Sequence, residues 1–351
     1  MAFGTLIEGK VIVEDKGDGN TLYNKGYYGK PLSGGGLELE LHEALYLLES
    51  NRLEVIDTQG KILSRDQLIK VLVAKEPRMV VNYPVYSEMR SRGYILKEAS
   101  KPADFRVFPR GGAPGKTPSQ YWLVCKAETD KFSIEEFQEL ADRMLEIKKT
   151  LITGLLDEEG DVTYYNITTI VLNGKTDIIP PRSRINGTVH GDKCNTDSDG
   201  ISLHEDGFFG HKQDQGIQLS LVETLFMLEN DILKVTNGKT NDVMDEVSLQ
   251  KYADKIQKDF PLRYAVYRDL RDRGLIPKTG FKYGTAFRCY VGRPGEHHAE
   301  YMIQPVDNDF ACSWYDVSRA VRVAHTVRKN FLLARNTNEG IIYLRIKRET
   351  P

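Results

Sequence analysis

The chain contains an internal repeat with a period of about 180 residues. The stretch GLELELHEALYLLESNRLEV, which begins at Gly36, aligns without gaps on GIQLSLVETLFMLENDILKV, which begins at Gly216, and nine of the twenty positions are identical. Roughly one identity is expected by chance, because common residues each make up about 5–10% of proteins. A period of this length is too long for a solenoid. The sequence therefore predicts two copies of one fold joined in tandem.

Three shorter pairs of segments keep nearly the same offset. They are GYYG at Gly26 and GFFG at Gly207, VYSEMRSRGYILK at Val85 and VYRDLRDRGLIPK at Val266, and FRVF at Phe105 and FRCY at Phe287. The matches run along most of each copy. Because duplicated segments keep a common fold, differences at matched positions are a guide to function.

Boundaries follow from this alignment and from composition. We predict a first repeat over residues 1–172, a connector over 173–185 that contains two prolines, and a second repeat over 186–351. A softer boundary divides each repeat into two subdomains. These are residues 1–78, 79–172, 186–260 and 261–351. Apolar residues at helical spacing follow Leu41, and short runs such as YWLVCKA and YMIQPV are typical of strands, so the predicted class is mixed α/β (α/β or α+β).

Composition excludes several classes of protein. The formal net charge is −2, and no apolar run approaches the roughly 18 residues of a membrane helix. The start, MAFGTLIEGK, lacks the pattern of a secretory signal, so we expect a cytoplasmic protein with no membrane partner. Four widely spaced cysteines argue against a zinc site and a disulfide framework. We expect no cofactor and no metal.

The two copies differ in their proton-transfer residues. Six of the seven histidines lie in the second copy. Tyr290 is matched by Phe108, which keeps the ring and lacks the hydroxyl, and His298 is matched by Pro118. Histidine titrates near neutral pH, and tyrosine, with an ordinary pKa near 10, needs a cationic neighbour to act as a base. The pattern predicts one catalytic copy and one architectural copy.

The last helix of the second copy is expected to carry Arg322, His325 and Lys329 at positions i, i+3 and i+7, on one face. A tyrosine and a histidine on neighbouring strands could then face a lysine across a small cleft. Such a trio suits metal-free RNA cleavage, in which a base takes the ribose 2′-OH proton, an acid protonates the leaving 5′-oxygen and a cation stabilises the added negative charge.

Three segments of the second copy resemble one protein family. GLIPKTGFKYGTAFRCYVG, HHAEYMIQPV and SWYDVSRAVRVAHTVRKNFLLA are similar to the archaeal tRNA-splicing endonucleases, in the form that fuses two repeats. The resemblance covers nearly the whole chain and implies, in each repeat, a small α/β subdomain followed by a restriction-endonuclease-like nuclease subdomain. It assigns the catalytic roles to Tyr290 as base, His298 as acid and Lys329 as the stabilising cation.

The resemblance also implies a substrate and an assembly. Family members cut precursor tRNA at a bulge–helix–bulge without metal, leaving a 2′,3′-cyclic phosphate and a 5′-OH. Arg322 and Arg345 match arginines that hold a bulge base between their planes. The fused form pairs as a homodimer, in which an acidic loop of the inactive repeat docks against the active one. The candidate loop residues are Asp157, Glu158, Glu159 and Asp161.

Several alternatives remain open at this point. His297 is a solvated neighbour of His298 or shares its role. A metal-dependent nuclease of similar core is disfavoured, since E-x-K runs at Glu14 and Glu146 lie in the first copy. A non-catalytic RNA-binding subunit is disfavoured by the retained tyrosine, histidine and lysine. Residues 195–206 are spaced like a calcium loop but lack convincing flanking helices.

Overall fold

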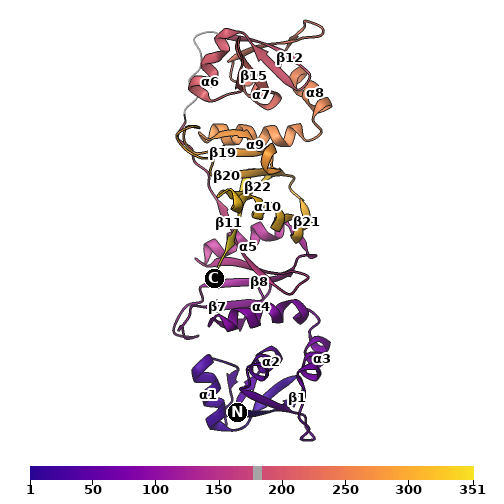
Figure 1. Ribbon diagram of the computed structural model, residues 1–351, viewed down its shortest axis with the longest axis vertical. Coiled ribbons are helices and arrows are strands. Elements are labelled where there is room, and N and C mark those ends of the chain that lie inside the picture. Colours follow the sequence, from indigo (N-terminus) through magenta and orange to yellow (C-terminus); the bar gives the residue numbers. More distant parts are fainter. Residues whose placement is uncertain (177–183) are drawn as a thin grey trace.

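The computed structural model describes residues 1–176 and 184–351, so part of the predicted connector, residues 177–183, lies outside the described residues. The molecule is elongated, with four blocks stacked along its length (Figure 1). The two N-terminal subdomains lie at the ends of the stack, and the two C-terminal subdomains meet in the middle.

The two end blocks share one topology. The first has strand order β3-β4-β2-β1-β5, and the second has β14-β15-β13-β12-β16, extended by β17. The elements of the first are β1 (Ala2–Ile7), β2 (Lys10–Val13), α1 (Lys16–Gly26), β3 (Lys30–Pro31), β4 (Leu37–Leu39), α2 (Leu41–Glu49), β5 (Leu53–Ile56) and α3 (Arg65–Lys75). Those of the second are β12 (Ile185–His190), β13 (Lys193–Thr196), α6 (Ile201–Gly207), β14 (His211–Lys212), β15 (Ile217–Ser220), α7 (Leu221–Glu229), β16 (Leu233–Asn237), β17 (Val243–Met244) and α8 (Glu246–Ile256).

The two central blocks also match each other, element for element. The first has α4 (Met79–Ser91), β6 (Ile95–Glu98), β7 (Phe105–Phe108), β8 (Tyr121–Ala127), β9 (Lys131–Ser133), α5 (Ile134–Glu146), β10 (Thr150–Leu156) and β11 (Val162–Ile170). The second has α9 (Phe260–Asp272), β18 (Ile276–Thr279), β19 (Phe287–Tyr290), β20 (Tyr301–Val306), β21 (Ala311–Ser313), α10 (Trp314–Thr326), β22 (Asn330–Thr337) and β23 (Gly340–Glu349). The predicted mixed α/β class and tandem duplication are confirmed.

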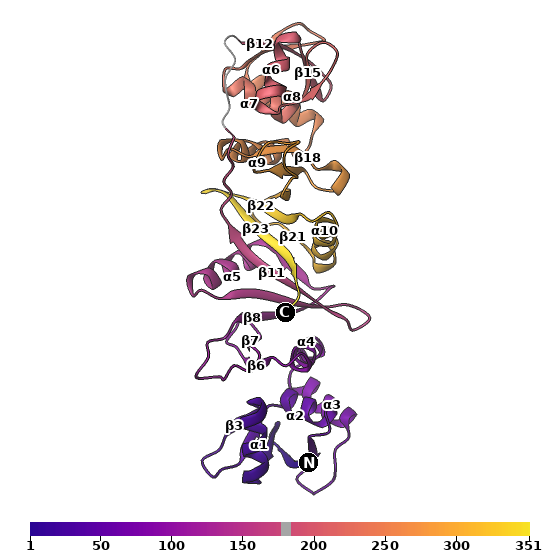
Figure 2. The same cartoon turned by 60° about the vertical axis from the view of Figure 1, so that its left-hand side comes forward.

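One continuous sheet joins the two repeats. Its ten strands run β18-β19-β20-β22-β23-β11-β10-β8-β7-β6, so the last strand of each repeat pairs with the other. β11 and β23 are antiparallel, with partners from Tyr164↔Glu349 to Ile170↔Tyr343, and they cross at the centre of the molecule (Figure 2). Each repeat thereby covers an edge strand that would otherwise be open for pairing.

The sheet has a core on each face. On one face, α5 and α10 cover a single cluster that includes buried residues of both repeats, with Trp314 packed edge-on against Phe132 and Phe137. On the other face, α4 and α9 each cover the strands of their own repeat. The shared core on the α5/α10 face makes the two central blocks one unit, because neither repeat can bury these side chains alone.

Local sequence explains where the helices begin and end. Ser313 caps α10 in a full capping box with Asp316, and the Ser133 side chain accepts a hydrogen bond from the Glu136 backbone at the start of α5. Gly93, just past the end of α4, has φ +90°, a left-handed conformation that glycine adopts without strain. These residues therefore set the starts of α10 and α5 and the end of α4.

A buried arginine holds each end block to its central block. In the second repeat, Arg271 of α9 donates to the Gly207 carbonyl oxygen at 3.1 Å and to the Tyr267 hydroxyl at 3.0 Å, and its guanidinium lies 3.8 Å from the centroid of the Phe209 ring. In the first repeat, Arg90 donates to the Gly26 carbonyl oxygen at 2.9 Å. The same contact therefore fixes the subdomain arrangement in both copies.

Removing this arginine should destabilise the second repeat. Arg271→Met leaves the Gly207 carbonyl without its donor and removes the cation–π contact, so we expect the free energy of unfolding to fall by about 2–4 kcal/mol. Arg268→Met is the matched control, because Arg268 is exposed on the same helix and lies 3.8 Å from Glu229. Thermal unfolding of the full chain measures both. Equal effects of the two substitutions would contradict the role assigned to Arg271.

Candidate active site

Three adjacent strands bring the predicted catalytic residues to one end of the sheet. Tyr290 is the last residue of β19, His298 lies three residues before β20, and Lys329 directly precedes β22. β19 is antiparallel to β20, and β20 is parallel to β22, so the end of the first strand meets the beginnings of the other two. Backbone hydrogen bonds continue this ladder beyond the strands, from Glu300 N to Cys289 O at 3.0 Å and from Asn330 N to Glu300 O at 2.9 Å.

The pleat of the sheet directs these residues to one face. Met302 and Phe331 belong to the core under α5 and α10. Arg288 is paired with Met302 and so lies on this α10 face, and Tyr290, two residues further along β19, lies on the same face. Lys329 is two residues before Phe331 and therefore also lies on the α10 face. Ala299 is buried, and alternation places the exposed His298 on the face opposite to Ala299, with Tyr290 and Lys329. Phe108 and Tyr121 of the first repeat occupy the strand positions of Tyr290 and Tyr301.

His297 makes contacts within its own loop. It forms an isolated bridge with Pro294, and its ring lies over Gly292, where an added Cβ would come within 2.8 Å of the ring's Cδ2. Its backbone N–H donates to the Arg293 carbonyl at 3.2 Å. These contacts hold His297 against the loop, whereas His298 stands at the strand end.

The expectation that Lys329 belongs to the last helix is wrong. α10 ends at Thr326, Arg328 takes a left-handed conformation with φ +56°, and Lys329 begins the run into β22. The Lys329 backbone N–H still closes the helix end by donating to the Ala324 carbonyl at 2.9 Å. The three residues therefore do not form a stripe on one helix face. Lys329 instead comes next to the strand end that carries His298.

The first repeat keeps this lysine, which the sequence comparison missed. Lys148 has the same left-handed conformation as Arg328, with φ +53°, so Lys149 is the counterpart of Lys329. The Lys149 ammonium donates to the Ser119 carbonyl at 2.9 Å. The first repeat has thus lost the tyrosine hydroxyl and the histidine but kept the cation.

Arg288 is a second feature that sequence reasoning missed. Its guanidinium lies 5.8 Å from the centroid of the Tyr290 ring. The two residues stand two apart in β19 and so share a face, which is a signal that the sequence contains. Arg288 therefore places a cation close to the Tyr290 ring.

The two arginines expected to hold a bulge base are not brought together in one chain. Arg322 is exposed on α10. Arg345 lies opposite Leu332, whose side chain belongs to the α9 face, and it donates to the Asn166 side-chain oxygen at 3.5 Å. Because Arg322 and Arg345 lie on opposite faces of the sheet, they do not flank a common space within the chain.

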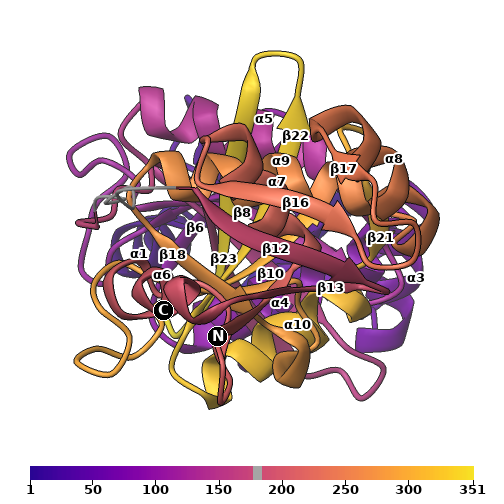
Figure 3. The same ribbon diagram turned by 90° about the horizontal axis from the view of Figure 1, so that it is seen from above.

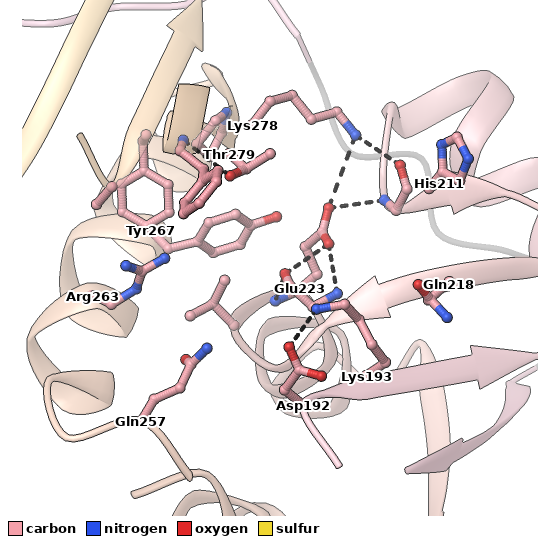
Figure 4. A pocket seen from close by; sticks show the side chains of 17 residues that line it. Asp192, Lys193, His211, Gln218, Glu223, Gln257, Arg263, Tyr267, Lys278 and Thr279 are labelled. Carbon is pink, nitrogen blue, oxygen red and sulfur yellow. Dashed lines mark hydrogen bonds and ion pairs between the residues drawn. The ribbon is translucent and has the colours of Figure 1, made fainter. Parts of the chain in front are cut away.

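A cleft separates the end block and central block of the second repeat. Its volume is about 440 Å³ (Figure 4). Lys193 and His211 reach it from the end block, and Arg263 and Lys278 from the central block. Burial lowers the pKa of Lys278, whose ammonium donates to the Gly210 carbonyl at 3.1 Å. The buried Nε of Arg263 has no hydrogen-bond partner within the described residues.

The matched region of the first repeat has the opposite charge. Four carboxylates there correspond to neutral residues in the second repeat; the pairs are Glu38 and Gln218, Glu40 and Ser220, Glu76 and Gln257, and Glu98 and Thr279. Burial and the neighbouring carboxylate of Glu40 raise the pKa of Glu98, so these groups lie within electrostatic reach of one another. Asn82 stands in place of Arg263. This region of the first repeat is therefore acidic, whereas the cleft of the second repeat lacks these four carboxylates.

The predicted docking loop is the turn between β10 and β11. The Asp157 carboxylate accepts backbone hydrogen bonds from Glu159 at 3.0 Å and from Asp161 at 2.9 Å, which closes the turn. Glu158, Glu159 and Asp161 are exposed. Three carboxylates are thus displayed on a turn whose shape is set by the fourth.

The described residues contain neither a membrane helix nor a metal cluster. Within residues 1–176 and 184–351, no helix is both long enough and apolar enough to cross a bilayer. In the same part of the chain, no group of three or more His, Cys, Asp or Glu side chains is arranged to hold a metal ion. The calcium-like stretch from Asn195 instead forms the end of β13, a 3₁₀ turn capped by Asp197 and helix α6.

Comparison with known proteins identifies relatives along the whole chain. A family model described as tRNA intron endonuclease, catalytic C-terminal domain, matches residues 79–164 and 260–343, and one described as tRNA intron endonuclease, N-terminal domain, matches residues 2–69 and 185–249. The chain is 35% identical to a tRNA-splicing endonuclease of Methanococcoides burtonii over 350 residues, covering 98% of each chain. It is 33% identical to that of Methanosarcina barkeri, covering 98% of this chain and 99% of the relative. Identity to that of Halobacterium salinarum is 28%, covering 92% and 93%.

Proposed function

The chain belongs to the tRNA intron endonuclease family, and from that premise we propose how it excises introns from precursor tRNA. We propose cleavage at a bulge–helix–bulge without a metal ion, leaving a 2′,3′-cyclic phosphate and a 5′-OH. The observation that carries this proposal is the meeting of Tyr290, His298 and Lys329 at one end of three adjacent strands. The second repeat is the catalytic one, and the first is architectural.

The proposed reaction is an in-line transfer within the RNA. Tyr290, acting as the general base beside Arg288, takes the proton of the ribose 2′-OH, and the 2′-oxygen forms a bond to the adjacent phosphorus. The bond from phosphorus to the 5′-oxygen breaks, and His298, acting as the general acid, donates a proton to that oxygen. Lys329 stabilises the additional negative charge on the non-bridging oxygens. No water is consumed, so the product is a cyclic phosphate.

One assay tests this chemistry. We expect the full-length protein to cut an intron-containing precursor tRNA at the same positions with and without excess EDTA. The 5′ ends should accept phosphate from a kinase without prior phosphatase treatment, and the 3′ ends should resist phosphatase until the cyclic phosphate is opened. Cleavage that stops in EDTA and returns with Mg²⁺ would indicate a metal-dependent nuclease. Binding without cleavage in either buffer would indicate a non-catalytic RNA-binding subunit.

We also propose RNA contacts for Arg322 and Arg345. A guanidinium plane can stack on any base, so an arginine contact tolerates sequence variation in the bulge. Arg322 is exposed on the α10 face, beside the end of the sheet that carries Lys329. Since Arg345 lies on the other face, the two arginines act at separate positions along the RNA or on different copies of the chain.

The proposed assembly is a homodimer held by the acidic turn. We propose that Glu158, Glu159 and Asp161 of one chain enter the cleft of the second repeat in another chain. Charge complementarity supports this pairing, because the cleft displays Arg263 with an unpartnered Nε and lacks the four carboxylates of the first repeat. The same carboxylates would repel the turn from the matched region of the first repeat, so the dimer forms in one arrangement.

A further inference from the structure

A basic groove lies beside Lys329, away from Tyr290. Its volume is about 570 Å³, and it runs between the end of α10 and the last residues of β23. Five of its residues carry basic side chains; they are His325, Arg328, Lys329, Lys347 and Arg348. No Asp or Glu lines it, and none of the five forms an ion pair within the described residues. The turn of the β22–β23 hairpin, at the opposite end of these strands from the groove, projects beyond the rest of the molecule (Figure 3).

Two of these cations face each other across neighbouring strands. Phe331 pairs with Ile346 in the β22–β23 ladder, and extending that register by two residues places Lys329 opposite Arg348. Directly opposite residues have their Cβ atoms about 4.5–5.5 Å apart, and like charges in that position are destabilising. Folding alone gives no reason to place two cations there that form no ion pair within the described residues, whereas binding of an anionic ligand between them gives one.

The first repeat lacks this arrangement at the matched positions. Leu151 pairs with Ile167 as Phe331 pairs with Ile346, so Thr168 and Thr169 correspond to Lys347 and Arg348. The Thr169 hydroxyl donates to Asp142 at 2.5 Å, and Leu145 stands in place of His325. The first repeat keeps Lys148 and Lys149 at the positions of Arg328 and Lys329, so the cations found only in the second repeat are His325, Lys347 and Arg348.

We infer that the basic groove, with Arg348 opposite Lys329 and with Lys347 also in its lining, binds backbone phosphates of the substrate RNA next to the cleaved bond. The inference rests on the proposed function, because the anion is then the strand that enters or leaves the site at Lys329. Phosphates carry one charge per nucleotide and take contacts from Lys and Arg without regard to sequence. The groove positions the strand, while Tyr290 and His298 perform the reaction.

The test replaces Lys347 and Arg348 of the full-length protein by threonine, the residue type found at the matched positions of the first repeat. In Lys347→Thr/Arg348→Thr, we expect the Kd for precursor tRNA at near-physiological salt to rise about tenfold. The slope of log K against log salt should fall by about 1.4–1.8, because each phosphate that is no longer neutralised accounts for roughly 0.7–0.9. The variant should also have a lower kcat/KM, and this decrease should come mainly from a higher KM rather than from a lower kcat. The melting temperature should stay the same or rise, because a like-charge pair is removed. Lys234→Thr, an exposed strand lysine in an end block, is the control and should change none of these quantities.

A modified substrate locates the contact. Neutral methylphosphonates at the one to three linkages on either side of the cut should weaken binding of the wild-type protein but have a smaller effect on the double variant. An unchanged Kd and salt slope in the double variant, with normal wild-type cleavage, would overturn the inference and leave the proposed function intact. So would a slope change without methylphosphonate coupling, which would indicate a dimer contact or a distant RNA contact. Absence of wild-type cleavage would instead contradict the proposed function.

Discussion

His298→Ala should lower the rate of precursor tRNA cleavage by about 100- to 10,000-fold, the range typical for removal of a general acid. Binding of the RNA should stay within about twofold, because the imidazole acts on the leaving oxygen rather than on affinity. His297→Ala should cut at nearly the normal rate, since the His297 ring packs against Gly292 in its own loop. Single-turnover kinetics at saturating protein separates the rate of the chemical step from binding.

The adjacent position of the two histidines makes this a strict comparison. Both are exposed, so neither substitution creates a cavity, and the melting temperatures of the two variants should match. A substrate whose 5′-oxygen is replaced by sulfur provides a second readout, because a thiolate leaves without protonation and should restore cleavage by the His298 variant. A dead His297 variant beside an active His298 variant would reverse the assignment.

Transferring the first repeat's carboxylates into the second cleft should prevent dimer formation. The variant carries Gln218→Glu, Ser220→Glu, Gln257→Glu and Thr279→Glu. Like charges facing each other across an interface cost several kcal/mol, so we expect the dimer dissociation constant to rise by at least about 100-fold. Sedimentation equilibrium over a range of protein concentrations measures it. The variant should fold normally, because glutamate already serves at the matched positions of the first repeat, where Glu40 takes part in the capping box of α2.

A compensating change distinguishes charge repulsion from damage to the cleft. Adding Glu158→Lys and Glu159→Lys to the four substitutions should restore dimer formation. The two lysine substitutions alone should weaken the wild-type dimer. If the four-site variant stays dimeric with unchanged affinity, the acidic turn does not dock in this cleft. If it dissociates but the lysines do not restore pairing, the cleft has another occupant.

Much of the fold could be predicted from local patterns. The offset between the copies identified the duplication, and the short apolar run YMIQPV indicated a strand. The comparison of Tyr290 with Phe108 selected the second repeat as catalytic. These inferences depend on short-range propensities or on one-to-one alignment, and both are visible in a linear sequence.

The end of α10 could not be predicted in the same way. Arg328 adopts a left-handed conformation without a glycine, so the sequence SRAVRVAHTVRK contains no stop signal before Lys329. The face of Arg345 was also inaccessible, because it depends on the register of β23 against β22 and β11. One residue of slip would have placed it on the same face as Arg322.

The sequence by itself determined that this chain is a duplicated mixed α/β protein with one repeat that kept a tyrosine and a histidine. Only the tertiary structure decided which residues lie together. The ten-stranded sheet brings Tyr290, His298 and Lys329 to one end, and it places Lys329 opposite Arg348, from the next strand of the sheet. The fold also brings Glu40 and Glu76 within electrostatic reach of Glu98, although the three are far apart in the chain. The physical reason is that propensity acts between neighbours in sequence, whereas charge and strand register act between neighbours in space.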